Sequence, residues 1–220
     1  MPSVNPRILF SIILLLLAGG AFSQESKSED LTIVYDIKVK STRSSTGIEE
    51  TYNGGIQTLM LKPGKARMRM VSLMRTQSIY FREAGNNVQE VIIAKESGKE
   101  KYKYRLNASA WKLYNSKYDK VQYSFEPSSI TVLGYQCKKA IVTMADGKKV
   151  IAYYTTALQQ PKYIEPMFAG IPGIVLQYEY VQKKGSITYV ASRISRNTID
   201  EDIFKEPGAS FASRTYIPTK

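Results

Sequence analysis

Cys137 is the first residue to consider for chemistry, because it is the only cysteine in this 220-residue sequence, which contains no histidine. A catalytic thiol needs a neighbouring base or a lowered pKa to become a thiolate, and histidine is the usual base. Lys138 is adjacent, but neighbouring residues of a strand point to opposite faces. We therefore predict that Cys137 is a buried structural thiol. A single cysteine also excludes an intramolecular disulfide and a multi-cysteine metal site.

The carboxylates are scattered along the sequence and form no recognisable motif. A glycosidase needs two carboxylates about 5–9.5 Å apart, but no motif brings together any pair among Asp36, Glu90, Glu165 and Glu179. The sequence has no Gly-x-Ser-x-Gly elbow and no Gly-x-x-x-x-Gly-Lys-Ser/Thr loop for phosphate. We therefore expect no catalytic residues, no metal site and no cofactor, and a hydrolase is the least favoured class.

The net charge of +12 favours polyanionic partners. Lysine pairs recur at 138–139, 148–149 and 183–184, and basic residues at 101, 103 and 105 alternate with Tyr102 and Tyr104. Interleaved basic and aromatic residues can bind single-stranded nucleic acid, but more often they form a solvated face that keeps sheet edges from pairing. We predict no nucleic-acid partner. An anionic envelope lipid or glycan is the more plausible polyanion, because the chain carries an export signal.

Residues 1–23 have the organisation of a secretory signal peptide. Arg7 precedes an apolar stretch from Ile8 to Ala18, and Ala21-Phe22-Ser23 forms a small-x-small cleavage site before Gln24. The 11 apolar residues are too few for a spanning helix, which needs about 20. We expect cleavage near Ser23 and Gln24, a mature protein without a transmembrane span, and a periplasmic or secreted location. Arg7 is the only charged residue removed, so the mature charge is +11.

The elements expected to position these residues are β-strands. From Leu31 onward, apolar residues alternate with polar ones in about ten short segments at spacings of 8 to 15 residues, which is typical of one all-β domain. We assign this domain to residues 31–211, with a flexible segment at 24–30 and a C-terminal tail at 212–220. Periodicity alone does not distinguish a curved half-barrel from a two-sheet sandwich.

Local signals refine this assignment at three places. Asp146-Gly147 predicts a type I′ hairpin turn, in which both central residues have positive φ. Gly170-Ile-Pro-Gly173 predicts a sharp turn close to another segment, with positive φ at Gly173. The following strand would present Ile174, Leu176, Tyr178 and Tyr180 on one face. One or two short helices are expected in the weakly periodic segments, such as Ser41–Gly54 or Ala157–Phe168.

Three short motifs resemble the GLPGLI family. Gly170-Ile-Pro-Gly-Ile-Val175 is similar to the signature of that family, with isoleucines in place of two leucines. Leu133-Gly-Tyr-Gln-Cys-Lys-Lys139, followed by Asp-Gly-Lys and a Tyr-Tyr-Thr-Thr strand, and the ending Ile203-Phe-Lys205 with Pro207-Gly208 also resemble it. The resemblance covers about residues 31–211. It implies an exported envelope protein of the Bacteroidota type, with the curved antiparallel half-barrel of the LolA/LolB lipoprotein carriers and a hydrophobic concave face.

In such a half-barrel, one face of the sheet is a concave surface that an apolar ligand can reach. Methionines and aromatic residues suit both a core and an adaptable pocket. The candidates for lining this surface are Met68, Met70, Trp111, Met144, Tyr154, Phe168 and Ile171.

Two functional hypotheses follow. The first is a non-catalytic module that binds a lipid, a lipoprotein acyl chain or another apolar ligand in the concave sheet, while basic residues at its rim meet anionic headgroups. The second is a periplasmic structural or interaction protein whose sheet is filled by its own side chains and whose basic surface docks an anionic envelope partner. A cavity above about 300 Å³ favours the first hypothesis.

Overall fold

The computed structural model describes residues 29–41, 52–85, 87–182 and 185–218, so the predicted signal peptide lies outside the described residues. The strands are β1 (Leu31–Ser41), β2 (Ile56–Lys62), β3 (Lys65–Val71), β4 (Thr76–Ala84), β5 (Asn87–Ser97), β6 (Glu100–Asn107), β7 (Gln122–Val132), β8 (Tyr135–Thr143), β9 (Lys149–Thr155), β10 (Ile174–Gln182), β11 (Gly185–Ser195) and β12 (Ala212–Ser213). The helices are α3 (Ala108–Tyr114) and the 3₁₀ helices η1 (Ser116–Tyr118), η2 (Pro166–Phe168) and η3 (Glu201–Phe204).

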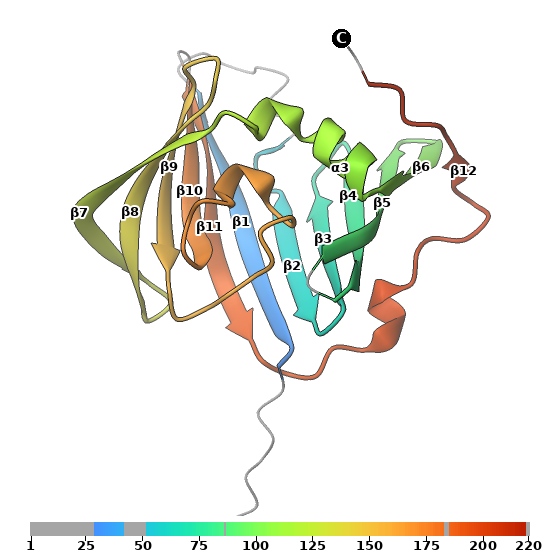
Figure 1. The fold of residues 1–220 in the computed structure, drawn as a ribbon, viewed down its shortest axis with the longest axis horizontal. Coiled ribbons are helices and arrows are strands. Elements are labelled where there is room, and N and C mark those ends of the chain that lie inside the picture. The colour runs from blue at the N-terminus through green and yellow to red at the C-terminus, as the bar shows by residue number, and fades with distance from the viewer. Residues whose placement is uncertain (1–28, 42–51, 86, 183–184, 219–220) are drawn as a thin grey trace, which may run out of the picture.

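All twelve strands belong to one curved sheet that is not closed into a barrel (Figure 1). Their order is β12-β6-β5-β4-β3-β2-β1-β11-β10-β9-β8-β7. Neighbouring strands are antiparallel, except that β12 pairs with β6 in parallel at Ala212 and Ser213. The predicted all-β class with a curved open sheet is confirmed, and the short β12 makes the sheet mixed. This pair also ties part of the expected C-terminal tail to the sheet.

The alternation of residue types explains why these segments form strands with one covered face. In β1, Ile33, Tyr35 and Ile37 are buried in the core, whereas Asp36 and Lys38 are exposed on the opposite face. Successive side chains of a strand point to opposite faces of the sheet, so a pattern that repeats every two residues buries one face and leaves the other in solvent.

The turn between β8 and β9 differs from the prediction. Gly147 has positive φ but Asp146 does not, so a type I′ turn across Asp146-Gly147 is wrong. The Gly147 N–H donates to the Met144 carbonyl, and the Met144 N–H donates to the Lys148 carbonyl, each at 2.9 Å. These bonds define a longer hairpin loop that ends in a left-handed glycine. Two adjacent residues with positive φ occur instead at Leu133 and Gly134, between β7 and β8.

Leu133 is a strained residue, because leucine rarely adopts positive φ and Leu133 has a φ of 49°. Replacing the half-exposed Leu133 with asparagine, which tolerates this conformation, should raise the free energy of unfolding by about 1 kcal/mol. Chemical denaturation of both proteins would measure the difference. Leu113→Asn is the control, because Leu113 is a similarly exposed leucine with negative φ. No gain at Leu133, or an equal gain at Leu113, would contradict the argument.

One α-helix forms in a segment where none was predicted. α3 covers Ala108–Tyr114, and the Asn107 side chain accepts a hydrogen bond of 2.8 Å from the Ala110 N–H at its start. The segment Ala157–Phe168 contains turns and ends in the 3₁₀ helix η2. Most of Ser41–Gly54 falls outside the described residues.

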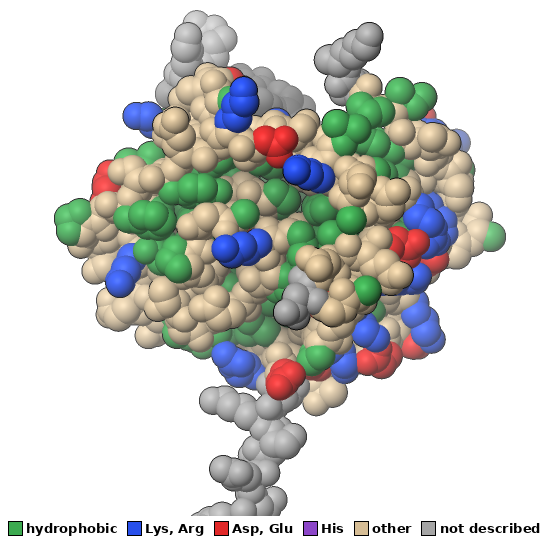
Figure 2. Space-filling view, viewed as in Figure 1, with side chains coloured by type: hydrophobic (Ala, Val, Ile, Leu, Met, Phe, Trp, Pro, Cys, Tyr) green, Lys and Arg blue, Asp and Glu red, His purple; other side chains and the backbone are tan. Residues whose placement is uncertain are grey.

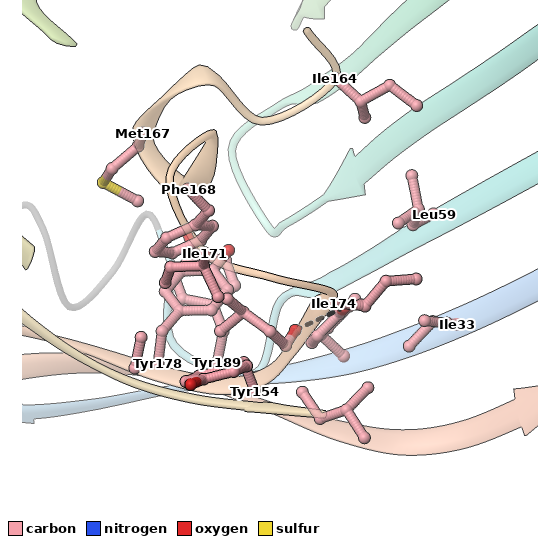
Figure 3. Packing of buried hydrophobic residues seen from close by; sticks show 14 of the residues in the cluster. Ile33, Leu59, Tyr154, Ile164, Met167, Phe168, Ile171, Ile174, Tyr178 and Tyr189 are labelled. Atoms are coloured by element: carbon pink, nitrogen blue, oxygen red, sulfur yellow. Dashed lines mark hydrogen bonds between the residues drawn. The ribbon is translucent and has the colours of Figure 1, made fainter. Parts of the chain in front are cut away.

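The β9–β10 loop, residues 156–173, lies over the concave face of the sheet (Figure 1). Five of its side chains are buried in the main hydrophobic core: Leu158, Ile164, Met167, Phe168 and Ile171. Figure 3 shows several of them packed above Tyr178 and Tyr189 of the sheet. The loop therefore fills much of the concavity.

The C-terminal strap, residues 199–216, covers part of the opposite face. Ile199 and Phe204 pack on Met60, and Phe211 packs on a small cluster that contains Tyr80 and Ile92. At the base of the strap, the buried Asp30 accepts a hydrogen bond of 2.7 Å from the Ile199 N–H. Asp30 is the last residue of the segment that was expected to be flexible.

Candidate functional site

The seven predicted lining residues do not share one site. Tyr154, Phe168 and Ile171 are buried in the core, and Met68 and Met70 are partly buried against it. Trp111 of α3 lines a cavity of about 360 Å³ beside Tyr163 and Lys162, and Met144 lines a larger cavity on the rim of the sheet.

Phe168 and Ile171 were predicted to line a concave surface open to ligand, but the structure buries both. Only 3% and 4% of their respective surfaces are exposed. The Phe168 ring meets the Tyr178 ring edge to face, with centroids 5.1 Å apart, and Figure 3 shows Ile171 beside it. Both residues belong to the β9–β10 loop and pack downward onto the sheet. Sequence reasoning could not separate this role from pocket lining, because both roles use the same apolar residue types.

The start of β10 is less regular than its alternation predicts. A bulge between Val175 and Gln177 places Val175 opposite Tyr154 and Tyr178 opposite Ala152. Val175 is therefore buried in the main core together with Ile174, Leu176 and Tyr178, which were predicted to share one face. Beyond the bulge, Tyr178 and Tyr180 still share one face, as predicted.

A cavity at the rim of the sheet, which we call the rim cavity, has a volume of about 660 Å³. Its apolar and aromatic lining consists of Tyr52, Tyr118, Met144, Tyr180, Ile187 and Tyr189. They come from the β8–β9 hairpin, the segment before β2, η1, β10 and β11. This volume is in the range of known small-ligand sites. Figure 2 shows the molecule from the same side as Figure 1. Hydrophobic patches lie over β7–β9, and most charged side chains lie toward the edges.

The rings of Tyr180 and Tyr189 form the tyrosine floor of the rim cavity, and both pack against Tyr178, which does not line it. Tyr178 and Tyr189 stack with their centroids 4.4 Å apart and their planes 10° apart, and Tyr180 meets both rings edge to face. Burial raises the pKa of Tyr189 to about 12 and holds the pKa of Tyr180 well above its usual value. These phenols therefore stay neutral at physiological pH. They offer flat apolar faces and hydroxyl groups, but no phenolate nucleophile.

Charged residues stand at the mouth of the rim cavity. The Lys117 ammonium lies 4.9 Å from the centre of the Tyr118 ring, and Lys148 pairs with Asp146 at 2.6 Å. Both lysines are exposed. The Arg75 guanidinium stacks on the Tyr52 ring, with its central carbon 5.0 Å from the centre of the ring. The mouth is thus partly basic, while the interior is aromatic.

Glu165 is a carboxylic acid on the covered face whose pKa departs from its ordinary value. It lies in the β9–β10 loop, and its carboxylate accepts a hydrogen bond of 2.9 Å from Gln160 Nε2. Burial raises the pKa of Glu165 to about 7. Its charge in turn contributes to the raised pKa values of Tyr178 and Tyr180. Glu165 therefore lies close enough to the tyrosine floor to influence it electrostatically.

Cys137 is fully buried, and burial raises the pKa of its thiol. Its S–H donates to the Tyr135 carbonyl at 3.5 Å. This is the environment of a structural thiol rather than of an activated nucleophile. The described residues contain no group of three or more His, Cys, Asp or Glu side chains that could hold a metal ion. No helix in the described ranges is long and apolar enough to cross a membrane.

The basic strand noted in the sequence forms part of a network of ion pairs. Lys101 pairs with Glu96 at 2.6 Å, and Lys103 and Arg105 pair with Glu206 of the strap. Arg105 also pairs with Glu90. These basic residues hold the strap against β6.

The fold and the rim cavity define a nearly all-β protein with one open curved sheet and an aromatic hollow at its rim. No protein-family model and no curated protein matches this chain. Two crystal structures of PNGF-II, in space groups C2 and P2₁, are similar at TM-scores of 0.49, with 16% and 15% identity. They cover 84% and 85% of this chain, which spans 31% of the length of either PNGF-II chain. An uncharacterised conserved protein from Thermus thermophilus is similar at a TM-score of 0.43 and 8% identity, over 94% of this chain and 99% of that one.

Proposed function

We propose that this protein is an exported envelope protein of the GLPGLI type that binds an amphiphilic ligand in the rim cavity. The ligand class is a lipid or acyl chain with an anionic headgroup. The apolar chain lies against the tyrosine floor, and Lys117 and Lys148 meet the headgroup at the mouth. The signal peptide and the motif resemblance support export, and the role is binding rather than catalysis.

The observation that carries this proposal is a cavity of about 660 Å³ whose aromatic interior adjoins two lysines, Lys117 and Lys148, the second of which pairs with Asp146. Removing apolar surface from water provides most of the binding energy of such a chain, at roughly 25 cal/mol per Å². The lysines add orientation and selectivity for an anion. The β9–β10 loop fills the centre of the sheet, so the ligand occupies the rim rather than the whole concavity.

Titration with dansyl-undecanoic acid, a fluorescent acyl chain with a carboxylate, tests this proposal. We expect saturable binding to the full chain, weakened at least tenfold by Met144→Glu, which places a negative charge in the cavity. Val181→Glu is the matched control, because Val181 is a half-exposed apolar residue of β10 outside the cavity lining. Absence of saturable binding, or the same loss in the control, would refute the proposal.

The role of the mouth is tested by a second pair of probes. Lys117→Gln combined with Lys148→Gln should weaken binding of the carboxylate probe severalfold and leave binding of an uncharged methyl ester of the same probe unchanged. Equal effects on both probes would mean that the lysines do not recognise the headgroup.

A further inference from the structure

Arg67 and Arg69 of β3 form a second basic cluster on the sheet face under the C-terminal strap. Arg67 Nη1 donates to the Ile203 carbonyl at 2.9 Å, and Nη2 donates to Ser78 Oγ at 3.1 Å. Its guanidinium carbon lies 4.8 Å from the centre of the Tyr80 ring. These contacts fix the plane of the Arg67 guanidinium and use two of its five N–H groups.

Arg67 Nε is buried and has no hydrogen-bond partner among the described residues. Arg67 also lines a hollow of about 210 Å³, together with Arg69, Thr76, Ser78 and Phe211. Burial lowers the pKa of Arg67, and the nearby charge of Arg69 acts in the same direction. Two like charges therefore stand at one small hollow, and a partly buried cation without an anionic partner is costly.

The neighbouring arginines show how the protein satisfies such charges elsewhere. Arg82 and Arg105 both pair with Glu90 and with Glu206 of the strap. By contrast, no carboxylate in the described part of the chain forms an ion pair with Arg67 or Arg69.

One carboxylate does line the hollow. Glu96 is there, but it is paired with Lys101 at 2.6 Å, which offsets its charge. Arg67 and Arg69 therefore have no carboxylate that neutralises them among the described residues.

We propose that this hollow binds a single tetrahedral oxyanion, a phosphate or sulfate group. Arg69 and the N–H groups of Arg67 Nη1 and Nη2 that the bonds above leave unused provide charge-assisted hydrogen bonds, which suit phosphate and sulfate oxygens. Ser78 accepts from Arg67, so its own hydroxyl hydrogen is available to donate, and Thr76 offers a second hydroxyl. The small volume suits one anionic group, either as a free ion or at the end of a larger lipid or glycan. This site is separate from the rim cavity and does not depend on it.

Calorimetric titration of the full chain with inorganic phosphate and with sulfate, at low ionic strength, tests the site. We expect one saturable site whose affinity falls at least tenfold in Arg69→Gln. Arg69 is exposed, so this variant should keep its fold, which circular dichroism would verify. Lys38→Gln removes one exposed positive charge from β1 and should leave the affinity within twofold. No saturable binding to the unmodified chain, or an equal loss in Lys38→Gln, would overturn the proposal.

A second measurement distinguishes the source of the anion. Phosphatidylcholine vesicles containing phosphatidic acid present a terminal phosphate, and plain phosphatidylcholine vesicles do not. Arg69-dependent sedimentation with the first vesicles alone would support a lipid-borne phosphate. Binding of free phosphate without vesicle binding would support a soluble anion. Sedimentation that Arg69→Gln leaves unchanged, together with no binding of free phosphate, would overturn the site.

Discussion

Gly173→Val should lower the free energy of unfolding by on the order of 3–5 kcal/mol. Gly173 has a φ of 120°, a conformation that residues with a side chain rarely adopt, and this positive φ was predicted from the sequence. A Cβ atom at this position would also lie 2.1 Å from the Thr155 carbonyl oxygen, far inside van der Waals contact. The backbone of β9 cannot move away without losing its pairing with β10. Both effects act against the folded state, and urea denaturation would measure their sum.

Gly208→Val is the matched control for this prediction. Gly208 lies in the strap, has no positive φ, and has no atom within 4 Å of the position that a Cβ would take. Its replacement should therefore change the free energy of unfolding by less than about 1 kcal/mol. A Gly173→Val protein about as stable as the unmodified chain would show that the turn does not approach β9 as closely as described.

The second large effect concerns pH. The free energy of unfolding should fall by about 2–3 kcal/mol as the pH rises from 5 to 8, because of Glu165. Burial raises the pKa of Glu165 from 4.5 to about 7 in the folded protein. Between these values the folded state binds more protons than the unfolded state, so stability decreases as the pH rises. The stabilising contribution is complete below about pH 4.5 and is lost through about pH 7.

This pH window isolates Glu165 from the other perturbed groups. The pKa values of Glu201 and Glu206 are lowered by their basic partners, so these carboxylates act at more acidic pH. The tyrosines with raised pKa values titrate only in strongly alkaline solution. Glu165→Gln should therefore flatten the dependence between pH 5 and 8, whereas Glu100→Gln, at the exposed start of β6, should leave it unchanged. A slope that survives Glu165→Gln would assign the effect to another group.

Much of the fold was predictable because the sequence repeats one simple pattern. Alternation in Ile33, Tyr35 and Ile37 requires a half-buried strand, and similar segments recur along the chain. Local turn chemistry was less informative. Asp146-Gly147 has the composition of a type I′ turn but closes a longer loop, while the paired positive φ values occur at Leu133-Gly134, where leucine gives no such signal. The conformation of both turns follows from the register in which β7, β8 and β9 pair.

The helix α3 was not predicted, for a related reason. α3 has seven residues, which are too few to show a clear helical period, and its aromatic residues are typical of strands. Asn107 was the available signal, since asparagine is a favoured N-cap.

The candidate site was less predictable than the fold. Of the residues proposed for one concave surface, Met144 alone lines the rim cavity, since the β9–β10 loop buries Phe168 and Ile171. Where a long loop packs is determined by contacts between distant segments, which residue types do not specify. The rim cavity itself draws on tyrosines from several separate segments. The abundance of tyrosine and the shared face of Tyr178 and Tyr180 were the only sequence signals for it.

The position of β1 has a consequence for how the chain folds. β1 lies in the interior of the sheet between β2 and β11, and its pairing with β11 joins Thr32 to Ser195. Closing so long a loop carries an entropic cost that local hairpins do not, and pairing between distant residues slows folding. The hairpins of β2–β6 and of β7–β11 can each form early, but they become one sheet only when β11 reaches β1. A chain emerging from the ribosome therefore cannot complete its core until almost all of it has been synthesised.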